Sequence, residues 1–155
     1  AASDVYKRQV KGQKGVLSVE KKLFVETNNG TNRQIRPVTP EQPLRIGDKV
    51  IVRLTIRTDR EMNYVFLKDL RAGCFEPADQ LSGPESRDGI WYYRSPKDVS
   101  ENFFINRLPE GTFVLEYPVY VSRSGEYAGG ISTIQCMYAP EFVSHTAGES
   151  LRIMP

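Results

Sequence analysis

The stretch that decides the fold is Leu108–Phe142, LPEGTFVLEYPVYVSRSGEYAGGISTIQCMYAPEF. From Phe113 to Val121 apolar side chains occupy every second position, which is typical of a strand with one face on a core. A connection with three glycines leads to a second extended run, Ile131–Tyr138. The two runs together predict a long β-hairpin. Because Pro118 has no N–H to donate, we expect the first strand to be bulged, at a sheet edge, or paired through its other side.

Similar patterns occur along most of the chain. Alternation at Val50, Val52, Leu54 and Ile56 gives the clearest strand, and Gly15–Thr27 gives another, although Lys21 interrupts its apolar face. Further strands are expected at four places: 64–68, 90–94, 102–106 and 142–153. Residues 69–88 are rich in Gly, Pro and Ser and are expected to form a long surface loop.

Turn signals separate these runs. Asn28-Asn29-Gly30 predicts a tight hairpin turn, because Asn and Gly tolerate positive φ. Asn29-Gly30-Thr31 also matches an N-glycosylation sequon, but the turn explains these residue types without it. No stretch of eleven or more residues has helical amphipathicity. The sequence therefore predicts an all-β fold, an antiparallel two-sheet β-sandwich, with a barrel as the alternative that the pattern leaves open.

Composition limits the domain organisation and the partners. At 155 residues the chain is long enough for one domain with its own core, which we place at residues 15–155. Residues 1–14 have no periodicity, and we interpret them as a disordered linker or a cloning remnant. With 21 basic and 19 acidic residues the chain is not a candidate for nucleic-acid binding. No apolar run approaches the roughly 18 residues of a membrane helix, so no direct membrane insertion is expected.

Candidate reactive groups do not form a recognisable catalytic or metal-binding pattern. The single histidine, His145, has no G-x-S-x-G nucleophile motif to serve, and a surface or strand-end position is expected. Cys74 and Cys136 lack C-x-x-C spacing and are expected to be free thiols rather than a disulfide. The carboxylates lack glycosidase or EF-hand spacing. We therefore expect a protein that is not an enzyme, with no catalytic, cofactor-binding or metal-binding residues.

Trp91-Tyr92-Tyr93 has two interpretations. In a strand Trp91 and Tyr93 share one face and Tyr92 takes the other, so at least one face should be core. Packing of the run inside a sandwich is the favoured interpretation. The alternative is a sugar-stacking platform on a stand-alone secreted adhesion or carbohydrate-binding module.

Several blocks of the sequence resemble the C-terminal macroglobulin-like domain of bacterial alpha-2-macroglobulins. The resemblance is carried by GDKVIVRLTIRTDREMNYVFLKDLRAGCFEP at 47–77, NFFINRLPEGT at 102–112, and the run TIQCMYAPEF at 133–142. These blocks occur in the family's order and the resemblance spans Val16–Ile153. It implies a macroglobulin-like, Ig-like sandwich that is a non-enzymatic part of an endopeptidase inhibitor. Such a parent protein is expected in the cell envelope, periplasmic or outer-surface, either secreted or lipid-anchored.

The same resemblance assigns a role to Met137 and Tyr138. In thioester-bearing members of the family this pair covers the thioester of a neighbouring thioester-type domain until a protease cuts the bait region. A reactive acyl group survives where apolar side chains exclude water, so the role is physically reasonable. Neither cysteine lies in a C-x-E-Q sequence, so this chain does not itself carry the thioester. Interdomain packing without a thioester is the alternative for the same two residues.

Overall fold

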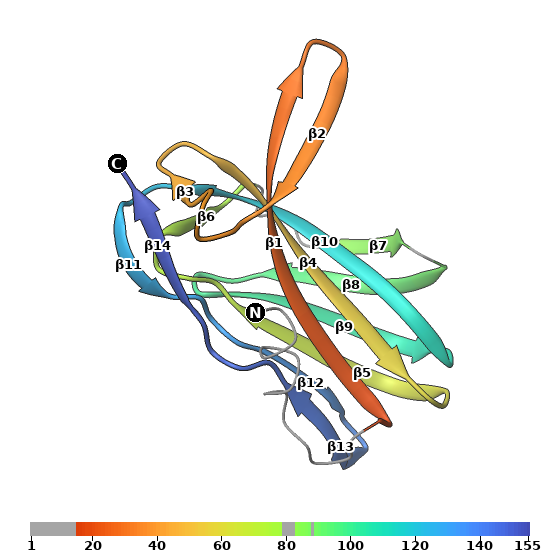
Figure 1. The fold of residues 1–155 in the computed structure, drawn as a ribbon. Helices are drawn as coiled ribbons and strands as arrows, with labels where there is room; N and C mark the ends of the chain where they lie inside the picture. Colours follow the sequence, from red (N-terminus) through yellow and green to blue (C-terminus); the bar gives the residue numbers. More distant parts are fainter. Residues whose placement is uncertain (1–14, 79–82, 88) are drawn as a thin grey trace.

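The computed structural model describes residues 15–78, 83–87 and 89–155, and every regular element in this part of the chain is a β-strand (Figure 1). The predicted linker 1–14 lies outside the described residues. A five-stranded sheet has the order β2-β1-β4-β10-β6. Its strands are β1 (Leu17–Asn29), β2 (Asn32–Pro37), β4 (Lys49–Thr58), β6 (Phe75–Pro77) and β10 (Gly111–Val121).

A six-stranded sheet, in the order β13-β12-β5-β9-β8-β7, forms the second layer (Figure 1). Its strands are β5 (Met62–Leu70), β7 (Gly83–Arg87), β8 (Ile90–Pro96), β9 (Ser100–Leu108), β12 (Ser132–Cys136) and β13 (Ala139–His145). A smaller sheet consists of β11 (Gly125–Ala128), β14 (Ser150–Met154) and β3 (Leu44–Arg45). The β14–β3 pair is parallel, and the other strand pairs are antiparallel. The predicted antiparallel β-sandwich is therefore confirmed.

The core lies between the two large sheets and follows from the alternation in the sequence. Val50, Val52, Leu54 and Ile56 are all buried on β4. Across β10, Leu115 pairs with Leu54, which places two apolar side chains side by side on the inner face. Contact across the layers is made by rings of β9 and β10, where Phe103 and Tyr117 have centroids 6.2 Å apart.

The predicted turn at Asn28-Asn29-Gly30 is confirmed. Strands β1 and β2 form an antiparallel pair that ends at Asn29 and Asn32, and Gly30 has φ 70°. This conformation is favourable for glycine, which has no Cβ to clash. The β1–β2 ribbon extends beyond the body of the sandwich (Figure 1).

The long hairpin predicted within Leu108–Phe142 is wrong. Strand β10 pairs with β4 and β6 in one sheet, whereas β12 pairs with β5 and β13 in the other. Alternation specifies which face of a strand is buried but not which strand lies beside it. Two runs that face one core from opposite sheets therefore have the same pattern as a hairpin. The intervening glycine-rich segment includes β11, which pairs with β14.

The expectation for Pro118 is confirmed. Strand β6 pairs only with Val119, Tyr120 and Val121, so β10 is an edge strand at Pro118 on the side away from β4. The carbonyl of Pro118 accepts a hydrogen bond from the Ala78 N–H at 3.3 Å. A residue without an N–H is tolerated in a strand at such an edge.

Two further expectations need correction. The region 69–88 is not one loop, because it contains the end of β5 and the short strands β6 and β7, while 79–82 and 88 lie outside the described residues. The predicted closing strand 142–153 is divided between β13 and β14, which belong to different sheets. Short strands with few apolar positions carry little periodic signal, which is why the sequence did not reveal β6 and β7.

Candidate functional site

Met137 and Tyr138 form the turn that connects β12 to β13. Strand β12 ends at Cys136 and β13 begins at Ala139, so only these two residues lie between the paired strands. Met137 is 54% exposed and Tyr138 is 80% exposed. Both side chains are therefore exposed to solvent, as a turn position allows.

Tyr64 of β5 supports this turn from the neighbouring strand. The Met137 N–H donates to the Tyr64 carbonyl at 2.8 Å. The rings of Tyr64 and Tyr138 meet edge to face, with centroids 5.0 Å apart and planes at 85°. Tyr64 is itself 50% exposed. We call Tyr64, Met137 and Tyr138 the hairpin tip; it is an exposed aromatic and thioether surface.

The base of the hairpin tip is attached to the fold at several points. Cys136 Sγ donates to the carbonyl of Asn63 at 3.4 Å. In the β12–β13 ladder Gln135 pairs with Val143 and Cys136 pairs with Ala139, so the register shifts between these two positions just before the turn. On β13, the ring of Phe142 lies 5.3 Å beneath the Arg60 guanidinium. The exposed turn is therefore held by a structured base.

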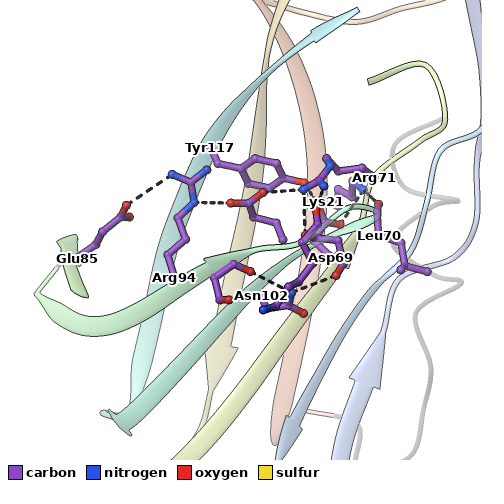
Figure 2. A network of polar contacts seen from close by, with 12 residues as sticks. Lys21, Asp69, Leu70, Arg71, Glu85, Arg94, Asn102 and Tyr117 are labelled. Atoms are coloured by element: carbon purple, nitrogen blue, oxygen red, sulfur yellow. Dashed lines mark hydrogen bonds and ion pairs between the residues drawn. The ribbon is translucent and has the colours of Figure 1, made fainter. Parts of the chain in front are cut away.

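A buried polar network joins the two sheets near the end of β5 and the start of β12 (Figure 2). Asp69 of β5 is fully buried and accepts hydrogen bonds from Lys21 Nζ at 2.7 Å, from Ser132 Oγ at 2.7 Å and from the Tyr117 hydroxyl. Lys21 Nζ also donates to the carbonyls of Leu70 and Gly129. The lysine that interrupts the apolar face of β1 is thus the partner of a buried carboxylate.

Glu101 is a second fully buried carboxylate in the network. Arg71 Nη1 donates to it at 2.9 Å, and Arg94 Nε donates to its other oxygen. Arg94 also lies 3.6 Å from Glu85 Oε1. Each buried carboxylate therefore has cationic partners, as a buried charge requires.

The network has the character of a structural connection. Burial, and next the charge of Asp69, raise the pKa of Tyr117 well above its ordinary value. The neutral Tyr117 hydroxyl donates a hydrogen bond to the buried Asp69 carboxylate and so stabilises the contact between β10 and β5. Both side chains are buried and therefore not accessible to a substrate. Apart from the position of Lys21, no pattern in the sequence indicated this network.

The aromatic run on β8 is divided between the two faces, as its alternation predicts. Tyr92 is 5% exposed and packs against Phe103, with ring centroids 5.7 Å apart. Trp91 and Tyr93 are 72% and 47% exposed. With Phe104 they line an open hollow of about 330 Å³ on the outer face of the six-stranded sheet. The interpretation of the whole run as core packing therefore holds for Tyr92 alone.

The remaining candidate residues lie apart from one another. His145 ends β13 and its Nδ1 lies 3.1 Å from the carbonyl of Thr146. Cys74 and Cys136 are buried free cysteines, and burial raises the pKa of the Cys74 thiol. Within the described residues, no group of three or more His, Cys, Asp or Glu side chains is placed to hold a metal ion. Nor does the described part of the chain contain a helix long and apolar enough to cross a membrane.

Comparison with known proteins gives one family match. The model of the family described as "Bacterial Alpha-2-macroglobulin MG10 domain" matches residues 17–141. Among curated proteins, "Circularly permutated Ras protein 2" of Dictyostelium discoideum is 28% identical over 109 residues, which is 70% of this chain and 3% of that protein. The chain thus spans a small fraction of that relative.

Similar solved structures support the same fold. Salmonella alpha-2-macroglobulin reacted with methylamine has a TM-score of 0.68 and 22% identity, covering 90% of this chain and 9% of that chain. Trypsin-activated alpha-2-macroglobulin from Escherichia coli has a TM-score of 0.68 and 17% identity, covering 90% and 10%. Native Escherichia coli alpha-2-macroglobulin, spanning MG7 to the C-terminus, has a TM-score of 0.67 and 17% identity, covering 90% and 24%. At these identities the likeness concerns the fold.

Proposed function

The chain belongs to the bacterial alpha-2-macroglobulin MG10 domain family, and we propose that it is a non-enzymatic docking domain of a larger endopeptidase inhibitor. The solved structures that it resembles are several times longer than the 155 residues of this chain. In the proposal, the domain packs against a neighbouring thioester-type domain of the same parent protein. The parent works in the cell envelope, periplasmic or at the outer surface, and proteases meet it as a whole molecule.

The observation that carries the proposal is the exposure of Met137 and Tyr138 on a supported turn. Large apolar side chains that are exposed on a supported turn are suited to insertion into a partner. Tyr and Met are enriched at protein interfaces, and central aromatic anchors dominate binding energy there. Because Met137 and Tyr138 are the exposed turn residues between β12 and β13, their side chains are free to enter a concave site on a partner. Filling such a site excludes water from any reactive acyl group within it.

The proposal is tested with the double variant Met137→Ala/Tyr138→Ala in a thioester-bearing full-length parent. Removal of two interface anchors worth about 2 kcal/mol together corresponds to roughly thirtyfold more frequent undocking. We expect methylamine to react with the parent faster by that factor. The matched control is Val99→Ala/Tyr120→Ala, which removes an apolar side chain and a tyrosine that are 66% and 44% exposed elsewhere on the domain.

Equal methylamine rates for wild type and the tip variant would show that the tip does not shield a thioester. If the tip serves interdomain packing alone, the tip variant should lower the unfolding temperature of the full-length parent and leave its methylamine rate unchanged.

A second candidate function rests on the exposed aromatics of β8. Trp91 and Tyr93 beside an open hollow could stack on sugar rings in an adhesion or carbohydrate-binding module. Under this function, Trp91→Ala abolishes retention on immobilised polysaccharides while Tyr138→Ala leaves it unchanged. Absence of retention of the wild-type chain on a polysaccharide array removes this candidate.

A further inference from the structure

Tyr64 has a backbone conformation that is unusual for its residue type. Its φ is 60°, and it is the one non-glycine residue with positive φ among the described residues. For a bulky side chain this region is a genuine outlier, because Cβ approaches the backbone too closely. Tyr64 is not in a tight turn but inside β5, two residues after the strand begins. Strain of this kind persists only where surrounding contacts impose it.

The contacts that impose the conformation come from the β12–β13 turn. In the β5–β9 ladder Asn63 pairs with Arg107 and Val65 pairs with Ile105, and the register passes over Tyr64. On the other side of β5 the Tyr64 carbonyl accepts the 2.8 Å hydrogen bond from Met137. The deviation therefore turns Tyr64 toward the residues of the turn.

The side chain of Tyr64 completes this arrangement. Its ring meets the Tyr138 ring edge to face at 5.0 Å, a favoured geometry for an aromatic pair. Tyr138, at 80% exposure, otherwise has little protein surface around it. The backbone carbonyl of Tyr64 thus restrains Met137, and the ring of Tyr64 restrains Tyr138.

We propose that Tyr64 is the positioning residue of the hairpin tip, holding Tyr138 in the orientation in which it docks. The inference rests on the docking function proposed above and adds a third residue to it. An anchor that is ordered before binding loses less side-chain entropy on docking, which raises affinity without a new contact. The partner surface that fits is an apolar recess with hydrogen-bond acceptors at its rim for the two phenol hydroxyls.

Tyr64→Gly separates positioning from a role in folding. Glycine adopts positive φ without strain, so the thermal midpoint of the chain is expected to stay the same or rise. Loss of the ring should nevertheless release Tyr138. In spectra of the chain with labelled tyrosine rings, we expect the Tyr138 signals to move to random-coil positions, and the Met137 amide to exchange faster. In the full-length parent the methylamine rate should rise by about fivefold, since an aromatic pair contributes on the order of 1 kcal/mol.

Two matched variants complete the test. Tyr64→Phe keeps the ring and should restore wild-type Tyr138 signals and methylamine rate. Tyr93→Gly removes a ring that is 47% exposed from β8, and should lower the midpoint while leaving the Tyr138 signals unchanged.

Wild-type Tyr138 signals in Tyr64→Gly would overturn the proposal, whether or not the thermal midpoint also falls. Failure of the docking function is distinguishable from failure of this inference. If Met137→Ala/Tyr138→Ala leaves the methylamine rate unchanged, docking by the tip is wrong, whereas the ring spectra still decide whether Tyr64 positions Tyr138.

Discussion

Lys21 Nζ lies 2.7 Å from Asp69 Oδ1, and this ion pair connects β1 of one sheet to β5 of the other. Asp69 is fully buried, and the Lys21 side chain is 10% exposed. In place of water, Asp69 accepts hydrogen bonds from the hydroxyls of Ser132 and Tyr117, and Lys21 donates to two backbone carbonyls. Removing only one of the two side chains would therefore leave the other charge buried without its counter-charge.

Lys21→Met is expected to lower the free energy of unfolding by about 3 kcal/mol, because it leaves Asp69 buried without its cation. Lys22→Met is the matched control. The Lys22 side chain is 56% exposed and its Nζ lies 3.5 Å from Glu20 Oε1, so the loss of this charge should change stability by about 0.5 kcal/mol or less. Urea unfolding followed by circular dichroism measures both, and similar losses for the two variants would contradict the role assigned to Lys21.

Gly130→Ala is expected to be severely destabilising because of a close backbone approach. A Cβ at Gly130 would lie 2.0 Å from the Leu70 carbonyl oxygen, and φ is +77°. Gly30 has a similar φ of +70° with nothing within 4 Å of an added Cβ, so Gly30→Ala isolates the backbone strain. We expect about 1–2 kcal/mol for Gly30→Ala and clearly more for Gly130→Ala. Equal effects in urea unfolding would show that the contact with Leu70 relaxes freely.

Tyr92 is expected to make stability fall at high pH. Burial, with a smaller contribution from Glu85, raises the pKa of Tyr92 from 10.0 to about 12. Because the folded-state pKa is above the unfolded value, the contribution is complete below pH 10 and is lost as the pH rises toward 12. Urea midpoints measured on both sides of pH 10 should therefore fall further for wild type than for Tyr92→Phe. Parallel decreases would mean that Tyr92 ionises equally easily in both states.

Both cysteine thiols should be slow to react in the folded protein. Cys74 and Cys136 are buried, and burial raises the pKa of the Cys74 thiol, which lowers its thiolate fraction. We expect a thiol reagent near neutral pH to modify two thiols rapidly in urea and neither of them rapidly in native buffer. Rapid native modification, located by peptide mapping, would identify a thiol that the sandwich does not cover.

The hairpin tip should be separable from folding. Met137→Ala/Tyr138→Ala removes side chains that are 54% and 80% exposed, so the free energy of unfolding of the chain should change by about 0.5 kcal/mol or less. Leu67→Ala, on the same strand as Tyr64 but fully buried, should cost about 2–5 kcal/mol. A large stability loss for the tip variant would mean that the tip is part of the fold, and it would remove its use as a clean docking variant.

Much of the fold was predictable because strand patterns are local. The alternation at Val50–Ile56, the turn at Asn29-Gly30 and the restriction that Pro118 places on strand pairing each depend on a few neighbouring residues. Met137 and Tyr138 were identified by resemblance, which reports a family's residue order rather than their exposure. Tyr64 had no comparable signal, because its importance depends on a dihedral angle and a ring contact that alternation does not encode.

The sequence by itself determined that the chain is built from strands and which side of the long strands is apolar, because a period of two residues assigns side chains to faces. Only the tertiary structure decided which strands are neighbours, so that β10 and β12 lie in different sheets rather than in one hairpin. It also decided that Lys21 meets Asp69 and that Tyr64 meets Tyr138. The physical reason is that these contacts join residues far apart in the chain, whereas the pattern of a strand describes only that strand's own two faces.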